Sequence, residues 1–125
     1  MNLQTVKYIG RGITLAFAII IVFGYYAISQ CANTPIVEQL SPNGDWELMI
    51  FERSCGSLTG NSTHISLIKS DQVLEDTAGN IYVAEGYPEG YDAEWLSDSS
   101  VKVSGIKGEN HLKVEAHEGI GVIYE

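Results

Sequence analysis

The chain has 125 residues, and its seven Lys and Arg stand against sixteen Asp and Glu. The formal net charge of −9 at pH 7 argues against nucleic acid and anionic lipid headgroups as partners, because both are bound through basic patches. The acidic balance is compatible with a basic protein partner, and equally with plain solubility, since a high net charge keeps domains dispersed.

Residues 1–29 predict a transmembrane helix. Lys7 and Arg11 are the only charges before Glu38, and they precede an apolar run at 13–28 that contains no charge and no proline. This run approaches the ~20 apolar residues that cross a bilayer, and basic flanks stay in the cytoplasm. We therefore expect a single-pass signal anchor at 1–29 in the inner (cytoplasmic) membrane, with residues 30–125 exported to the periplasm or extracellular space.

Two alternatives to an uncleaved anchor remain open. Residues 27–29 form a small-x-small cleavage site, so the segment fits a removable signal peptide, although its apolar run exceeds the usual ~7–15-residue core. The other alternative is lipidation of Cys31, for which Gln30 directly before the cysteine is a poor fit.

The two cysteines, Cys31 and Cys55, both follow the apolar segment. Export places them in an oxidising space, which predicts a disulfide between them. In the chain-entropy model such a bond stabilises the fold by about 3 kcal/mol, and it would tie the start of the domain to a strand near its centre. A reactive Cys55 thiol is the alternative.

The rest of the chain reads as short strands separated by clusters of Gly, Asn, Pro, Asp and Ser. Between the first two strands, Pro42 suits the second position of a type I turn and Gly44 suits a positive φ. The connections are too short for helical crossovers, so we expect an all-β, antiparallel domain, a sandwich or curled meander. Its seven to eight short strands are expected at 37–40, 46–53, 64–69, 81–85, 93–96, 101–103, 112–116 and 121–124.

Several short motifs carry a family resemblance. The chain resembles a family of small bacterial membrane-anchored proteins of unknown function, which implies one membrane segment plus one β domain and no established activity. In this chain Ser54 replaces a usual acidic residue and Leu58 a usual threonine. The main motif residues are Ser41, Pro42, Gly44, Phe51, Arg53, Cys55, Gly56 and Thr59. Further matches lie at 62–63, 79–84 and 95–98.

No catalytic or metal-binding signature emerges from the sequence, and we expect no cofactor. His111 and His117 fall on one face of a predicted strand but ~20 Å apart, so they are expected on a solvated face, as is His64. The segment 54–56 offers a nucleophile without an evident base. The acidic residues around 85–94 match no calcium motif and are expected to form a surface loop.

Aromatic residues near the acidic loop are the predicted contact surface. Tyr87, Tyr91 and Trp95 are residue types that anchor protein interfaces, although core packing explains Trp95 equally well. Arg53 is interpreted as structural, pairing with Glu52, Asp45 or Glu47 or with backbone carbonyls.

The leading hypothesis is a non-enzymatic envelope protein whose anchored β module contacts another protein or envelope component. The alternative is a membrane-held inhibitor or immunity protein that binds a basic toxin. After residue 29 the chain has five Lys and Arg and all sixteen acidic residues, a formal charge of −11 that would steer a basic partner. A thiol or metal enzyme is the third and weakest hypothesis.

Overall fold

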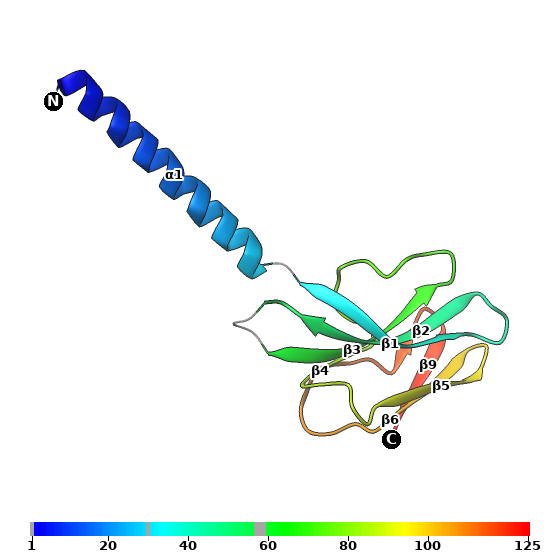
Figure 1. Ribbon diagram of the computed structural model, residues 1–125. Helices are drawn as coiled ribbons and strands as arrows, with labels where there is room; N and C mark the ends of the chain where they lie inside the picture. Colours follow the sequence, from blue (N-terminus) through cyan, green and yellow to red (C-terminus); the bar gives the residue numbers. More distant parts are fainter. Residues whose placement is uncertain (1, 30, 57–59) are drawn as a thin grey trace.

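The N-terminal segment is one long helix. A computed structural model describes residues 2–29, 31–56 and 60–125, and in it α1 (Leu3–Ser29) projects from the β domain as a rod (Figure 1). Leu3–Tyr25 is long and apolar enough to cross a membrane and lies near the N-terminus, so it fits a membrane anchor or a signal sequence. The helix begins before the apolar run because Lys7 and Arg11 are themselves good helix formers.

Nine strands follow in the described part of the chain, arranged in two sheets with the orders β1-β2-β3-β4-β7 and β5-β6-β9-β8. Figure 1 shows the two layers. The all-β domain after an apolar helix is thus confirmed, and of the two architectures expected it is the sandwich. The strands are β1 (Ala32–Leu40), β2 (Trp46–Ser54), β3 (Asn61–Lys69), β4 (Tyr82–Glu85), β5 (Asp92–Ser97), β6 (Ser100–Ser104), β7 (Asn110–Lys113), β8 (Ala116–His117) and β9 (Ile120–Tyr124).

One strand pair departs from the expected antiparallel pattern. β6 and β9 are parallel, with Ser100 opposite Gly121 and Val103 opposite Tyr124. After β6 the chain contributes β7 to the five-stranded sheet and then returns through β8, so β9 enters the smaller sheet in the same direction as β6. The crossover that a parallel pair requires is therefore made by a strand of the other sheet instead of a helix.

The predicted strand at 112–116 is wrong as a single element. β7 pairs with β4, whereas β8 pairs with β9 in the other sheet. At the crossing, the Val114 N–H donates to the Ile81 carbonyl at 2.8 Å and the Tyr124 hydroxyl donates to the Val114 carbonyl at 2.6 Å. A two-residue alternation reports which face a side chain takes, but not which sheet its backbone joins.

The first strand is longer than the sequence predicts. β1 begins at Ala32 instead of residue 37, and its register with β2 shifts between Pro35 and Val37. Proline is tolerated because β1 lies at the edge of its sheet, where one row of backbone groups needs no partner strand. The proline and the bulge conceal this strand from a pattern search.

The core lies between the two sheets. Leu48 and Ile50 of β2 and Val101 and Val103 of β6 belong to one buried cluster, and all four are at most 1% exposed. Tyr82 packs against Tyr91 and Tyr124 with ring centroids 5.8 and 5.9 Å apart, and burial raises the pKa of Tyr124 to about 12. Other core residues are Ile65, Leu67, Ile81, Ala84, Ala93, Ile120 and Val122.

The outer face of the larger sheet is also covered, which explains the unbroken apolar run of β2. Leu48 and Ile50 point inward, whereas Met49 and Phe51 are buried on the opposite face. We call the β3–β4 connection, residues 70–80, the strap, because it crosses this outer face. Its backbone and side chains bond to β1 and β3, as described below. β2 is therefore a central strand with both faces buried, as its composition predicts.

The β1–β2 turn is built by the predicted residues. The Gly44 N–H donates to the Ser41 carbonyl at 2.9 Å, which places Pro42 at the second turn position, and Gly44 has φ 76°. The buried Ser41 hydroxyl accepts the Trp46 N–H at 3.0 Å and bonds to Asn43 Oδ1 at 2.7 Å. Residues 41–44 therefore set the hairpin turn.

Candidate functional site

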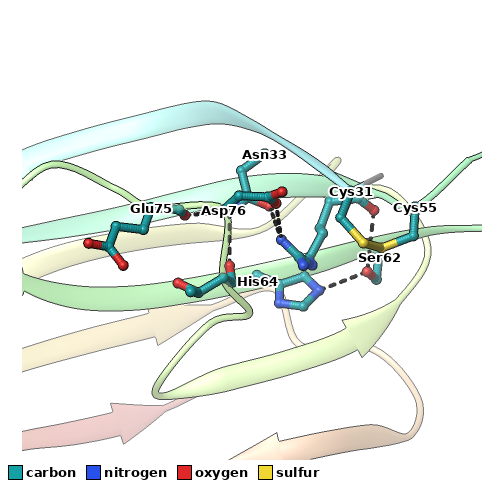
Figure 2. Close-up of a disulfide and its surroundings, with 9 residues drawn as sticks. Cys31, Asn33, Cys55, Ser62, His64, Glu75 and Asp76 are labelled. Atoms are coloured by element: carbon teal, nitrogen blue, oxygen red, sulfur yellow. Dashed lines mark hydrogen bonds and ion pairs between the residues drawn. A yellow bond between two sulfur atoms is a disulfide. The ribbon is translucent and has the colours of Figure 1, made fainter. Parts of the chain in front are cut away.

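A disulfide closes one end of the β1–β2 hairpin (Figure 2). Ala32 and Ser54 are register partners, so Cys31 and Cys55 meet one step beyond the ladder, and they are bonded although 24 positions apart in sequence. The bond joins the edge strand to the central strand β2, as expected. It also fixes the position of the side chains that hold the strap.

Arg53 is the centre of a polar cluster beside the disulfide. Its Nη1 donates to Asp76 Oδ1 and to Asn33 Oδ1, each at 2.8 Å, and its side chain is 15% exposed. The Asn33 amide in turn donates to the carbonyls of Glu75 and Thr77 at 3.1 and 2.8 Å. The structural role of Arg53 agrees with the sequence interpretation, but its acidic partner is Asp76 of the strap and none of the three expected carboxylates.

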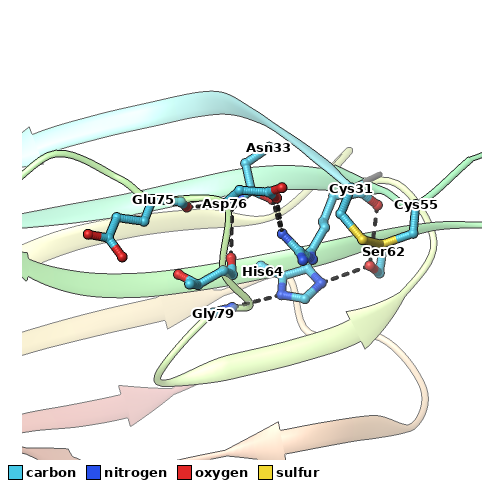
Figure 3. A network of polar contacts seen from close by, with 10 residues as sticks. Cys31, Asn33, Cys55, Ser62, His64, Glu75, Asp76 and Gly79 are labelled. Atoms are coloured by element: carbon cyan, nitrogen blue, oxygen red, sulfur yellow. Dashed lines mark hydrogen bonds and ion pairs between the residues drawn. A yellow bond between two sulfur atoms is a disulfide. The ribbon is translucent and has the colours of Figure 1, made fainter. Parts of the chain in front are cut away.

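His64 is buried under the strap and is not on a solvated face (Figure 3). Its Nδ1 accepts the Gly79 N–H at 2.8 Å, its Nε2 lies 2.7 Å from the Ser62 hydroxyl, and its ring stacks on Phe51. Burial, followed by the nearby Arg53 charge, lowers the pKa of His64 to about 4. The expectation of a solvated strand face fails here because the strap covers β3.

The Ser62–His64 pair has the wrong polarity for a nucleophile and its base. Because Nδ1 accepts a backbone N–H, the proton of the neutral imidazole is on Nε2, which therefore donates to the Ser62 oxygen. A catalytic base must instead accept the hydroxyl proton at that nitrogen. The bond from Gly79 to His64 holds the strap on β3, and the Ser62–His64 pair within β3 does not activate the serine.

Gly79 and Asn80 attach the end of the strap to β3. A Cβ at Gly79 would lie 2.7–2.9 Å from backbone atoms of Ile65 and Tyr82, so only glycine permits this approach. The Asn80 side chain accepts the Leu67 N–H at 2.8 Å and donates to the Leu67 carbonyl at 2.7 Å. Asn80 thus provides hydrogen-bond partners for the backbone N–H and carbonyl of Leu67, in the part of β3 that the short strand β4 does not reach.

Two grooves flank the strap. The larger, of about 600 Å³, lies between the strap and the outer faces of β1 and β2. Its apolar lining comes from Pro35, Met49, Ile68, Val73 and Leu74, and its acidic lining from Glu38, Glu47, Glu75 and Asp76. The second, of about 550 Å³, lies on the β3 side and shares Ile68 and residues 72–75.

The predicted contact residues do not form one exposed surface. Tyr87 is 64% exposed, whereas Tyr91 and Trp95 are half-buried and pack against the core. The Trp95 indole N–H donates to the Gln39 carbonyl at 3.0 Å and so joins the β5 edge to β1. Packing within the sandwich accounts for both half-buried residues.

The motif residues separate into two structural groups. Ser41, Pro42 and Gly44 make the β1–β2 turn, while Phe51, Arg53 and Cys55 lie together at the disulfide end of the outer face. Gly56 follows with φ 104°. Thr59, and Leu58 beside it, lie outside the described residues.

The remaining histidines belong to different sheets. His111 of β7 lies 3.1 Å from Glu85, whereas His117 of β8 packs edge-on against Trp46. They were expected on one strand. Within residues 2–29, 31–56 and 60–125, no group of three or more His, Cys, Asp or Glu is placed to hold a metal ion.

Sequence reasoning missed Asn33 and Asp76, the two residues that connect Arg53 to the strap. Neither belongs to a recognisable motif, and each meets Arg53 only through the fold. Gly79-Asn80 was recognisable as a turn, but its packing on β3 was not.

Comparison with protein-family models, curated proteins and solved structures finds no match.

Proposed function

We propose that this protein is a non-enzymatic, single-pass envelope protein whose exported β module contacts another protein or envelope component. The observation that carries the proposal is the position of the disulfide. Its first cysteine, Cys31, follows α1 almost directly, and a helix able to cross a membrane therefore leads straight into a stapled domain. Disulfides persist in oxidising compartments, which supports export of the β domain.

The orientation follows from charge. Lys7 and Arg11 precede the apolar run, and a basic flank is retained in the cytoplasm. The α1 segment then crosses the inner (cytoplasmic) membrane once, and residues 30–125 lie in the periplasm or extracellular space. The donor polarity of the Ser62–His64 pair supports a binding role over hydrolysis.

The test is a combined topology and mass measurement on the full chain isolated from membranes. A C-terminal alkaline phosphatase fusion should be active, and the intact mass should correspond to an uncleaved chain lacking the two hydrogen atoms lost when Cys31 and Cys55 are oxidised to a disulfide. An inactive phosphatase fusion, or thiols at Cys31 and Cys55 that label without reduction, would contradict the proposal. A mass lacking the N-terminal segment would identify a cleaved signal peptide and contradict the proposal of a membrane anchor.

A second candidate is a membrane-held inhibitor or immunity protein for a basic toxin. The observation that favours it is the surplus of sixteen acidic residues over five basic ones after residue 29. Such a surplus speeds encounter with a basic partner. A toxin gene beside this one, and loss of toxin resistance on deletion, would support it; unchanged resistance on deletion would exclude it.

A further inference from the structure

The larger groove beside the strap combines an apolar floor with acidic walls. Met49 and Ile68 form part of the floor, and Val73 of the strap, 84% exposed, stands at the rim. Next to the groove on β1, Leu40 is 61% exposed and is the register partner of Glu47. Met49 is already buried, so an apolar side chain entering here would remove from water mainly the carbon surfaces of Val73 and Leu40 and the exposed part of Ile68.

The charge of the groove is largely uncompensated. Four of its lining residues are carboxylates and none is basic, and only Asp76 has a cationic partner, Arg53 at 2.8 Å. In the described chain no salt bridge involves Glu38, Glu47 or Glu75. Glu38 and Glu47 come from the sheet and Glu75 from the strap, so negative charge stands on both sides of the floor.

This arrangement favours an extended cationic chain over a single metal ion. The carboxylates do not converge, since no group of three or more acidic, His or Cys side chains in residues 2–29, 31–56 and 60–125 is placed to hold a metal. Dispersed charges on both walls match basic side chains on either side of an apolar one. A polycation without an apolar side chain would be attracted by the same carboxylates but would gain nothing from the apolar floor.

We propose that this groove is the contact site of the β module, and that its occupant is a segment of a partner protein in which basic residues flank an apolar side chain. The apolar side chain lies on the floor formed by Met49 and Ile68, and the basic side chains pair with Glu38, Glu47 and Glu75. This inference rests on the proposed function and names the surface and the partner chemistry.

The first test uses the full chain in a nonionic detergent and a fluorescent tetrapeptide with three lysines around one leucine. We expect an anisotropy increase that the same peptide with glutamates does not give. The variant Glu38→Gln/Glu47→Gln/Glu75→Gln should weaken binding roughly tenfold near 0.05 M salt and less at higher salt. The matched control, Glu89→Gln/Asp98→Asn/Glu109→Gln, changes the net charge equally at exposed positions outside the groove and should bind as wild type.

Equal weakening in both triple variants would reduce the effect to bulk charge and overturn the proposal. So would equal binding of the glutamate peptide, or no binding at millimolar peptide. A tetrapeptide with glycine in place of leucine tests the floor: if it binds as tightly, the apolar part of the site is wrong.

The second test separates this proposal from the proposed function. A photoreactive amino acid is placed at Val73, on the groove rim, or at Glu109, distant in the fold, in cells that make the full chain. A crosslink at Val73 to a basic segment of a partner, reduced by the groove triple variant, supports the groove. Crosslinks that form only from position 109 would agree with a module that contacts a partner but would overturn the groove as its contact site. The absence of crosslinks from both positions would overturn the proposed function itself.

Discussion

His64 carries a structural role that is sensitive to pH. Both ring nitrogens are occupied, one by the Gly79 N–H and one by the Ser62 hydroxyl, so the folded protein holds a neutral imidazole. Burial and the Arg53 charge lower its pKa to about 4, and the Glu85 carboxylate opposes them. Protonation would place a charge under the strap and break the bond from Gly79.

The first prediction is a loss of stability as the pH falls from about 6.5 to about 4. In this window the unfolded chain binds a proton at His64 and the folded chain does not. The free energy of unfolding therefore decreases as the pH is lowered, by up to roughly 3 kcal/mol. His64→Gln should remove this slope in chemical denaturation of the full chain. The control His111→Gln changes a largely exposed side chain and should keep it; an unchanged slope in His64→Gln would refute the role.

Gly79 gives the second prediction at this scale. A methyl group there would meet three backbone atoms at 2.7–2.9 Å, and strands β3 and β4 must shift to admit it. Gly79→Ala should destabilise the fold by about 1–3 kcal/mol, as overpacking does. Gly60 has open space around its Cβ position, so Gly60→Ala should be close to neutral in the same denaturation series.

The strap is the element whose position depends most on a few side chains. Asn33 donates to two of its backbone carbonyls, while Arg53 reaches it only through the exposed carboxylate of Asp76. A side chain that donates to two carbonyls at once contributes more than an ion pair with one exposed partner. Asn33 is therefore the main attachment on the β1 side.

The third prediction compares the two attachments. Asn33→Ala should cost about 1–2 kcal/mol and increase amide hydrogen exchange in residues 74–80, whereas Asp76→Ala should cost under about 1 kcal/mol. Hydrogen exchange of the full chain, read at peptides covering the strap and at β6 as an internal reference, measures both. Equal hydrogen exchange in the two variants would mean that contacts other than those of Asn33 hold the strap in place.

The strands also show how far the sequence predicts this fold. Hairpins with a recognisable turn, such as β1–β2 with Pro42 and Gly44, follow from local chemistry alone. The crossing at Val114 does not, because tertiary hydrogen bonds from Ile81 and Tyr124 decide which sheet the chain joins. The strap is equally hidden, since the polar residues of 70–80 resemble an ordinary loop and reveal nothing of the sheet face beneath them.

At the scale of the whole molecule, one covalent bond is expected to supply a large part of the stability of this small domain. Cys31–Cys55 joins the edge strand to the central strand, and the Arg53 cluster that holds the strap lies beside it. The disulfide and the acidic balance were foreseeable from the sequence. The groove was not, because it requires β1, β2 and the strap to be placed together.

The fourth prediction is that Cys31→Ser/Cys55→Ser folds to the same sandwich but loses about 3 kcal/mol in free energy of unfolding. Circular dichroism checks that the strands are kept, and urea denaturation of the full chain in detergent measures the loss. Wild type treated with a reductant should match the double variant. Identical midpoints with and without reductant would mean that the bond contributes nothing to stability.

The position of Cys31 also decides how the domain resists tension. A pull transmitted along α1 enters the sandwich at this residue, and the covalent bond passes it directly to β2, between two hydrogen-bonded neighbours. Edge strand β1 is thereby bypassed, so it cannot be unzipped residue by residue from its N-terminal end. With the bond reduced, the same pull would peel β1 away first and carry with it the acidic wall at Glu38.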